Sequence, residues 1–329
     1  MKIYHVVIFL LSSSFCHTAH AVSLPGIPEF IDEMVAKHKF NRAELESAFE
    51  HAKHIPRVVE AISRPATIRP WLEYRASFVN PERVRLGLKF WSKYENAFQK
   101  AELKYGVPQE IILAVIGVET VYGLDVGTFR TLDALTTLAF DYPRRADFFR
   151  SELENYLLLA RDQGFDLLAI RGSYAGALGI PQFMPSSYRT YAVDFSGDNK
   201  VDLMGEAKDA IGSVASYLSG YGWRNGKDIA VRARINEDVC AGEIATRRTV
   251  AAWSAAGAIP QGKVAEADSA RLVDFTVDGG KEFWLAFENF DVITRYNNSD
   301  YYAMTVLQLA EAVKAARKEN EIKKASSAR

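Results

Sequence analysis

The spacing of apolar residues constrains the fold of this chain more than any other feature of its sequence. Apolar residues recur at helical spacing through most of the chain, in residues 29–63, 81–104, 107–222 and 302–313. Residues 225–290 differ, because short runs there alternate between apolar and polar residues, and Gly279-Gly280 separates two of these runs. A glycine pair in that position is typical of a β-hairpin. The sequence therefore predicts a mainly α protein of the α+β class with one small β-containing lobe.

The N-terminus has the features of a cleavable secretory signal. Lys2 precedes an apolar run from Val6 to Leu11, and Ala19-His20-Ala21 fits a cleavage site. No stretch of the chain is apolar over the ~20 residues that a membrane helix needs. Phe15 stands where a lipoprotein signal before Cys16 would need a small residue. We therefore expect a periplasmic protein that is exported by a signal peptide, without a membrane span or a lipid anchor.

The composition excludes several kinds of chemistry and several partners. Removal of the signal leaves Cys240 as the last cysteine, so no intramolecular disulfide can form. The formal net charge of -1 provides no positive field for nucleic acid or anionic lipid. All six histidines precede residue 55, away from the loop-rich middle, which argues against a Ser-His-Asp triad or a zinc hydrolase. Carboxylate chemistry is what remains.

The strongest candidate for that chemistry is Glu119, near the end of a helix predicted to begin at Pro108. Ile116, Val115 and Ile112 lie three, four and seven residues before it, so Glu119 falls on the apolar stripe of its own helix. Burial there would disfavour the charged form and raise the pKa, as a general acid requires. Spacing alone equally allows a glutamate whose side chain reaches solvent at the helix end or pairs with a structural arginine.

Five sequence blocks, found in one order, resemble the lytic murein transglycosylase B family. They are Gly117-Val-Glu-Thr-Val-Tyr-Gly123, Asp141-Tyr-Pro-Arg-Arg145, Ser173-Tyr-Ala-Gly-Ala-Leu-Gly-Ile-Pro-Gln-Phe-Met-Pro-Ser-Ser187, Asp194-Phe-Ser-Gly-Asp198 and Arg295-Tyr-Asn-Asn-Ser299. The resemblance implies a lysozyme-like catalytic core with an N-terminal helical lobe and a small inserted β-containing lobe. The expected segments are a signal peptide (1–21), a helical lobe (22–104), the core with an EF-hand-like loop (105–224), the β-containing lobe (225–288), a return to the core (289–317) and a frayed polar tail (318–329).

The resemblance also implies the roles of individual residues. Glu119 would be the acid/base, Ser173 and Gln182 would contact the sugar at the reactive centre, and Arg144 and Arg145 would contact the peptide stem through their guanidinium groups. The residues implied to line the glycan groove are Tyr74, Tyr217, Tyr296, Asn297 and Tyr302. The chain departs from the family at Ile180-Pro181, where a Gly-Tyr-Gly sequence is expected before the glutamine, and at Phe148, which is a tyrosine in some relatives.

A loop in the predicted core resembles a calcium-binding EF-hand. Asp194, Ser196, Asp198 and the carbonyl of Lys200 present hard oxygens at alternate positions. The sixth position is Asn199, which enters the left-handed region more readily than most residues. Because the twelfth position is Gly205 in place of glutamate, a later carboxylate must complete the set, and Asp209 matches the family ligand. We expect structural calcium here and no cofactor for catalysis.

The resemblance implies a lytic transglycosylase that cleaves the bond between N-acetylmuramic acid and N-acetylglucosamine in peptidoglycan and leaves 1,6-anhydromuramoyl ends. Asp125 is the carboxylate nearest to Glu119 in sequence and has no role that the family assigns. Two alternatives stay open, a hydrolytic muramidase with the same glutamate and a non-catalytic peptidoglycan-binding protein. The expected partners are glycan strands with their peptide stems, and other cell-wall enzymes remain unassigned.

Overall fold

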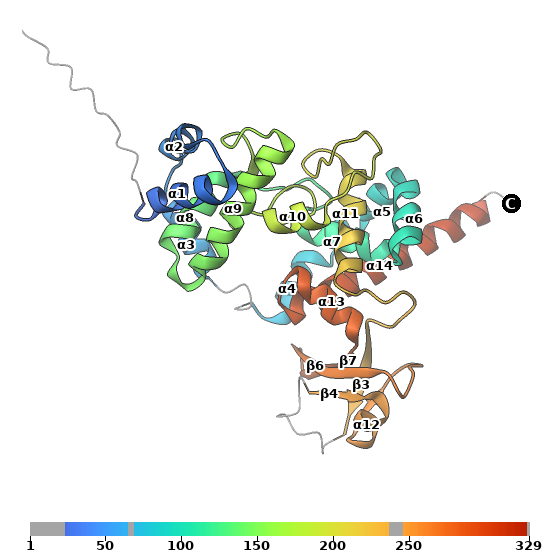
Figure 1. Cartoon of the computed structure of the whole chain (residues 1–329). Helices are drawn as coiled ribbons and strands as arrows, with labels where there is room; N and C mark the ends of the chain where they lie inside the picture. Colours follow the sequence, from blue (N-terminus) through green and yellow to red (C-terminus); the bar gives the residue numbers. More distant parts are fainter. Residues whose placement is uncertain (1–23, 65–68, 237–245, 328–329) are drawn as a thin grey trace, which may run out of the picture.

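The computed structural model describes residues 24–64, 69–236 and 246–327, so the expected signal peptide and Cys240 lie outside the described residues. Figure 1 shows a body of helices from which a small sheet-containing lobe projects, with the N-terminal and C-terminal helices at opposite ends. Among the described residues, no helix combines the length and apolar character needed to cross a membrane. The mainly α fold with a small antiparallel sheet, expected from the periodicity, is confirmed.

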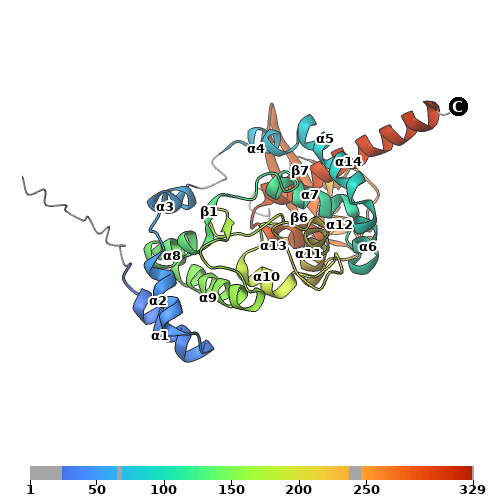
Figure 2. The same cartoon turned by 90° about the horizontal axis from the view of Figure 1, so that it is seen from above.

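Five helices form the N-terminal end of the body: α1 (Ile27–His38), α2 (Arg42–Glu50), α3 (Pro56–Ser63), α8 (Thr131–Asp141) and α9 (Ala146–Gln163). Phe30 of α1 packs edge-on against Phe49 of α2 and Phe140 of α8, with ring centroids 6.0 and 5.9 Å away. The buried carboxylate of Asp133 accepts a hydrogen bond from the backbone of Lys53 at 2.9 Å, which ties the α2–α3 connection to α8. Figure 2 shows this group at one side of the molecule.

A second group of helices surrounds α7 (Gln109–Thr120), which is buried over most of its length. Its neighbours are α5 (Pro81–Lys93), α6 (Glu95–Tyr105), α11 (Ala207–Gly220) and α14 (Asp300–Ser327). The structure therefore divides residues 22–104, which the sequence prediction grouped in one helical lobe. Helices α5 and α6 pack on the core because Trp91 and Phe98 are buried there, whereas α3 packs on α8.

Short elements connect these two groups and carry the residues of the central loops. They are α4 (Trp71–Phe78), η2 (Pro143–Arg145), α10 (Pro185–Tyr191) and the antiparallel pair β1 (Phe129–Arg130) and β2 (Arg171–Gly172). Gly179 allows a close backbone approach in this region. With φ at 69°, a Cβ atom at this position would lie 2.2 Å from the carbonyl oxygen of Leu203, so a larger residue would force the loops apart.

The projecting lobe contains an antiparallel five-stranded sheet in the order β4-β6-β7-β3-β5. Its strands are β3 (Ala230–Ile235), β4 (Arg247–Thr249), β5 (Ala258–Pro260), β6 (Ser269–Val277) and β7 (Gly280–Ala286). Strands β6 and β7 form the expected hairpin, in which Val277 pairs with Gly280. Trp253 of the short helix α12 (Val250–Ala255) packs with Leu272 and Leu285 in a separate small core. The chain returns from this lobe through α13 (Glu288–Tyr296).

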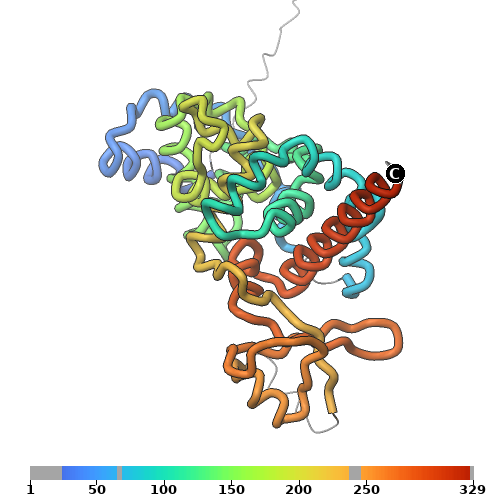
Figure 3. The backbone as a smooth tube through the Cα atoms, turned by 90° about the vertical axis from the view of Figure 1, so that its right-hand side faces the viewer, coloured from blue at the N-terminus to red at the C-terminus, as the bar shows by residue number. Residues whose placement is uncertain are grey.

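The C-terminal helix corrects the expectation of a frayed tail after residue 317. Helix α14 continues to Ser327, and Figure 3 shows it running along the helical body and beyond it. Most residues of this extension are good helix formers. Arg317 lies over the ring of Trp91 at 4.4 Å and pairs with Glu321 one turn later at 3.0 Å, which supports the helix where it leaves the body.

Candidate active site

Glu119 lies one residue before the end of α7, where the backbone turns through an unusual conformation. Val121 and Tyr122 both have positive φ angles, 52° and 62°, and this region is unfavourable for a β-branched residue. Hydrogen bonds hold the turn in place. Thr120 Oγ1 donates to the carbonyl oxygen of Ile180 at 2.7 Å, and Arg83 donates to the carbonyl oxygen of Gly117. Strained backbone of this kind is concentrated at functional sites, and here it fixes the orientation of the Glu119 side chain.

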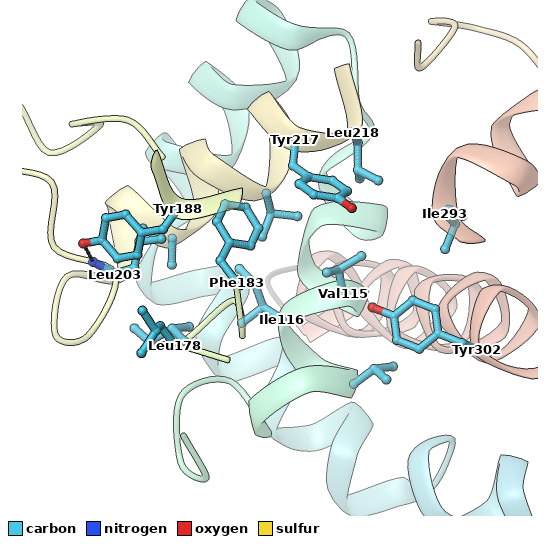
Figure 4. Close-up of a cluster of buried hydrophobic side chains, with 14 of the residues drawn as sticks. Val115, Ile116, Leu178, Phe183, Tyr188, Leu203, Tyr217, Leu218, Ile293 and Tyr302 are labelled. Atoms are coloured by element: carbon cyan, nitrogen blue, oxygen red, sulfur yellow. Dashed lines mark hydrogen bonds between the residues drawn. The ribbon is translucent and has the colours of Figure 1, made fainter. Parts of the chain in front are cut away.

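The carboxyl group of Glu119 is desolvated and bonded to one hydroxyl group. Tyr302 Oη donates a hydrogen bond to Glu119 Oε1 at 2.6 Å. Figure 4 shows the Tyr302 hydroxyl pointing from α14 toward α7, beside Val115. Burial raises the pKa of Glu119 to about 7, and the hydrogen bond from Tyr302 opposes that shift. Glu119 is therefore able to carry a proton near neutral pH.

Three tyrosines form one continuous wall beside this carboxyl group. The rings of Tyr296 and Tyr302 are stacked, with 13° between their planes, and the Tyr217 ring lies 4.7 Å from that of Tyr296. Tyr217 Oη donates to the carbonyl oxygen of Arg295 and Tyr296 Oη to that of Pro181, each at 2.6 Å. Since both hydroxyl groups are bound to the backbone, the rings are fixed and present rigid aromatic surface.

Tyr74 approaches Glu119 from α4. Burial and the charge of Glu119 raise the pKa of Tyr74 to about 12. Its ring packs in an aromatic cluster with Trp71, Phe78 and Tyr301. The charge of Glu119 raises the pKa of tyrosines on four helices, α4, α11, α13 and α14: Tyr74, Tyr217, Tyr296 and Tyr302.

The loop that bears Gln182 is tightly bonded within itself. Gln182 has a φ angle of 52°, and its amide nitrogen donates to the carbonyl oxygens of Val126 and Gly179 at 3.1 and 2.9 Å. Ser173 Oγ accepts backbone hydrogen bonds from Ala175 and Ala177. The carboxamide oxygen of Gln182 and the hydroxyl hydrogen of Ser173 therefore remain for a ligand.

The unexpected pair Ile180-Pro181 anchors this loop to three neighbouring segments. The carbonyl oxygen of Ile180 accepts from Thr120 and that of Pro181 accepts from Tyr296. The backbone nitrogen of Ile180 donates to the carbonyl oxygen of Leu203 at 2.8 Å. These three hydrogen bonds connect the loop to α7, to Tyr296 at the end of α13 and to the segment that contains Leu203.

A groove of about 750 Å³ runs along these elements. It brings together most of the residues singled out in the sequence: Glu119, Arg145, Ser173, Gln182, Tyr217, Tyr296 and Asn297. Its lining does not include Tyr302, which donates to Glu119, Tyr74, whose pKa the charge of Glu119 raises, or Arg144, which is exposed on η2. Phe148, which is 38% exposed, also lines the groove, and the guanidinium group of Arg145 lies over its ring at 4.2 Å.

Sequence reasoning missed a second carboxylate in the groove. Glu152 of α9 is only 4% exposed, and its two oxygens accept hydrogen bonds from the hydroxyl and the backbone nitrogen of Ser186, at 2.6 and 2.9 Å. Burial raises the pKa of Glu152 above its ordinary value, although both bonds oppose this shift. Its position among Phe149 and Tyr156 on an apolar stripe was a usable signal, the same one that identified Glu119.

The EF-hand-like loop is stabilised by bonds from its carboxylates to backbone amides. Asp209 is fully buried and accepts from the nitrogens of Phe195, Ser196 and Asp202 at 2.8, 2.8 and 2.9 Å. Asp194 accepts from Gly197 and Asn199. Asn199 has a φ angle of 66°, as expected at the sixth position.

The oxygens of this loop suit calcium chemically. No group of three or more acidic, histidine or cysteine side chains within the described ranges is arranged to hold a metal ion. Asp198 instead accepts from the backbone nitrogen of Lys200 at 2.9 Å. Calcium binding by Asp194, Ser196, Asp198, Lys200 and Asp209 therefore stays a prediction.

Comparisons with known proteins agree with this geometry. Residues 25–311 match the model of a family described as "Transglycosylase SLT domain". The chain is 44% identical over 303 residues to the membrane-bound lytic murein transglycosylase B of Escherichia coli (strain K12), which covers 89% of this chain and 84% of the relative.

Solved structures extend the likeness to the fold. The lytic transglycosylase Slt35 of Escherichia coli, in complex with bulgecin A, matches with a TM-score of 0.85 and 44% identity over 91% of this chain and 96% of that one, and it has also been solved in complex with calcium. SltB3 of Pseudomonas aeruginosa, in complex with NAG-NAM-pentapeptide, matches with a TM-score of 0.78 and 30% identity over 88% of this chain and 78% of that one. The lysozyme-like core is thereby confirmed. The chain belongs to the family of transglycosylases with an SLT domain.

Proposed function

We propose that this protein is a lytic transglycosylase of peptidoglycan and that Glu119 is its single acid/base. The observation that carries the proposal is the position of Glu119, a carboxyl group with a pKa near 7 at the wall of a large aromatic groove. Pyranose rings present apolar C–H faces that suit tyrosine rings, while their hydroxyl groups find polar neighbours. Membership of a transglycosylase family supports the same activity.

The chain of proton transfers begins with protonated Glu119. Because Tyr302 donates to Oε1, the acidic proton is expected on Oε2, from which it passes to the glycosidic oxygen between N-acetylmuramic acid and N-acetylglucosamine. The bond from that oxygen to C1 of the muramoyl residue breaks. The substrate's own N-acetyl oxygen stabilises the positive C1, since Asp125 is exposed and both oxygens of Glu152 are bound to Ser186.

Glu119 then acts as the base. Its carboxylate takes the proton from the C6 hydroxyl group of the same muramoyl residue as that oxygen bonds to C1. The products are a free C4 hydroxyl group on N-acetylglucosamine and a 1,6-anhydromuramoyl end, and no water is consumed. Glu119 is protonated again at the end of the cycle.

The remaining groove residues are assigned to substrate binding. Ser173, Gln182 and Asn297 offer hydrogen-bonding groups at the groove surface. Arg145 lies in the groove with Arg144 beside it on η2, where both guanidinium groups could pair with carboxylates of a peptide stem. The complex of the relative SltB3 with NAG-NAM-pentapeptide supports glycan with a peptide stem as the ligand class.

The mass of the product tests the reaction. Digestion of peptidoglycan sacculi is expected to release muropeptides whose muramoyl ends are one water lighter than reducing ends, because C6 replaces water as the nucleophile. Mass spectrometry before and after borohydride reduction distinguishes the two, since only reducing ends take up hydrogen. Predominantly reducing ends would indicate a hydrolytic muramidase, and intact sacculi a binding protein.

The pH dependence of activity tests the state of Glu119. The pKa of this group is raised to about 7, and the protonated form is the proton donor, so kcat/KM should fall as the pH rises through about 7. The variant Tyr302→Phe removes a hydrogen bond that stabilises the carboxylate. The basic limb of its pH profile, where kcat/KM falls, should therefore move to higher pH. A basic limb at the same pH in both proteins would contradict the assignment of Glu119 as the proton donor.

Export is proposed from the N-terminal sequence. A signal peptide that ends near Ala21 would deliver the mature protein to the periplasm, where peptidoglycan is found. N-terminal sequencing of the protein from the periplasmic fraction should give a chain that begins near Val22. An N-terminus at Cys16 that carries a lipid would show that the protein is a lipoprotein instead.

We also propose that the EF-hand-like loop binds structural calcium. The supporting observations are the alternating hard oxygens of the loop and the complex of the relative Slt35 with calcium. The fully buried Asp209 connects this loop to α11, so calcium would stabilise the loop against the core and leave the chemistry at Glu119 to the protein's own side chains.

A further inference from the structure

Helices α13 and α14 meet at a corner that carries three residues of the proposed site. Tyr296 ends α13, Asn297 lies in the turn, and Tyr302 is in the first turn of α14. Side chains on both sides of the corner are anchored elsewhere, since Tyr296 Oη donates to the carbonyl oxygen of Pro181 and Tyr302 Oη donates to Glu119. The backbone bonds of the corner itself are local, from Ser299 to Asn297 and from Ala303 to Ser299. Helix α14 packs directly on α7, so the placement of its first turn, which carries Tyr302, depends on that packing and in addition on what holds this turn to α13.

A single arginine from the β-containing lobe spans this corner. Arg271 of β6 donates from Nη1 and Nη2 to the two oxygens of Asp300 at 2.9 and 2.6 Å, and from Nε to Asp291 at 2.8 Å. Asp291 lies on α13, and Asp300 is the first residue of α14. All three bonds use one rigid planar group, so the guanidinium fixes the distance and the angle between the helices.

The environment of Arg271 makes this bridge stronger than an ordinary surface ion pair. Its side chain is 16% exposed and lies over the ring of Phe290 at 5.3 Å. Burial alone would lower the pKa of Arg271, but the bonds to Asp300 and Asp291 outweigh it and raise the pKa. Arg247 of β4 adds a second bond to Asp291. If Arg271 were absent, Asp300 would lose both of its bonds to the guanidinium group and Asp291 would keep only its bond to Arg247.

We propose that Arg271 is a positioning residue for the reaction, which holds Tyr302 against Glu119 by bridging Asp291 and Asp300 across the α13–α14 corner. The small lobe would then contribute to catalysis without touching the substrate. The inference rests on the proposed role of Glu119 and adds to it a requirement for the β-containing lobe.

A double-mutant cycle between Arg271 and Tyr302 tests the proposal. Arg271→Gln should lower kcat about ten- to a hundred-fold, as expected for a small displacement of a catalytic contact. In Arg271→Gln the fall of kcat/KM at high pH should also move to higher pH, as in Tyr302→Phe. If Arg271 acts through Tyr302, the double variant should be no slower than Tyr302→Phe alone. Arg271→Lys should recover only part of the activity, because an ammonium group cannot bridge both carboxylates in one plane.

Two further variants keep the result decisive. Lys281→Gln breaks an ion pair with Asp274, and both of these residues belong to the β6–β7 hairpin. This control variant should leave kcat and the pH at which kcat/KM falls unchanged. Asp300→Asn weakens the same bridge from the α14 side, and it serves if Arg271→Gln does not fold, as judged by circular dichroism. The proposal would be overturned if the losses of kcat in the two single variants multiplied in the double variant. It would also be overturned by a folded Arg271→Gln or Asp300→Asn protein whose kcat/KM falls at the same pH as that of the wild-type protein. Activity in Glu119→Gln would instead overturn the assignment of the acid.

Discussion

The variant Glu119→Gln is expected to lose turnover by roughly 10³-fold or more, because one group supplies both the proton and the base. Glutamine keeps the size of the side chain and can still accept a hydrogen bond from Tyr302, so the fold and glycan binding should remain. Release of soluble muropeptides from sacculi measures the loss, and co-sedimentation with sacculi measures the binding.

The matched control is Glu110→Gln on the same helix. Glu110 pairs with Lys314 at 2.6 Å and does not line the groove, so this variant should retain the wild-type rate. A Glu119→Gln protein that still releases muropeptides at a comparable rate would show that another group is the acid. The groove contains one other carboxylate among the described residues, Glu152, which would be the next to replace.

The variant Asp209→Ala is expected to destabilise the protein by about 3 kcal/mol or more, because it leaves three partly buried backbone amides without their acceptor. In the absence of calcium the melting temperature should fall by roughly 6 °C or more. Asp209→Asn retains one acceptor oxygen and should lose less. The control Asp198→Ala removes an exposed carboxylate that accepts one amide, and it should change the melting temperature little.

Calcium addition separates the structural role of Asp209 from its proposed role as a ligand. Calcium should raise the melting temperature of the wild-type protein, since a ligand that binds the folded state stabilises it. It should not stabilise Asp209→Ala. If calorimetry detects no heat of calcium binding to the wild-type protein, the loop is a polar turn that is held by its own hydrogen bonds.

Local sequence signals were sufficient for several features of this molecule. The β6–β7 hairpin could be predicted because a glycine turn and alternating strands are adjacent in sequence. The raised pKa of Glu119 could be predicted because the glutamate lies on a helix whose other residues are nearly all apolar and buried. Glu152 meets the same criterion, which shows that an apolar stripe identifies a buried carboxylate without indicating what it does.

Features that depend on distant contacts could not be predicted in this way. The helical pattern of residues 22–104 gives no sign that α3 packs on α8 while α5 packs on α7, because the partners lie elsewhere in the chain. Arg271 on β6 bonds to Asp291 on α13 and to Asp300 on α14. The separations of these three residues in the sequence follow no helical or strand periodicity, so no pattern predicts the contact. The polar composition after residue 317 indicates exposure to solvent, but it does not exclude a helix, and the good helix formers there continue α14 to Ser327.

The hydrogen bond between Tyr302 and Glu119 joins residues that are 183 positions apart. The β-containing lobe is inserted between them, so the chain must complete that lobe and return to the core before the donor can reach the carboxylate. During synthesis, a nascent chain that ends within the lobe already contains Glu119, Ser173, Gln182 and Tyr217 but not Tyr296 and Tyr302 of α13 and α14. The order of residues thus delays assembly of the site until nearly the whole protein has emerged and folded.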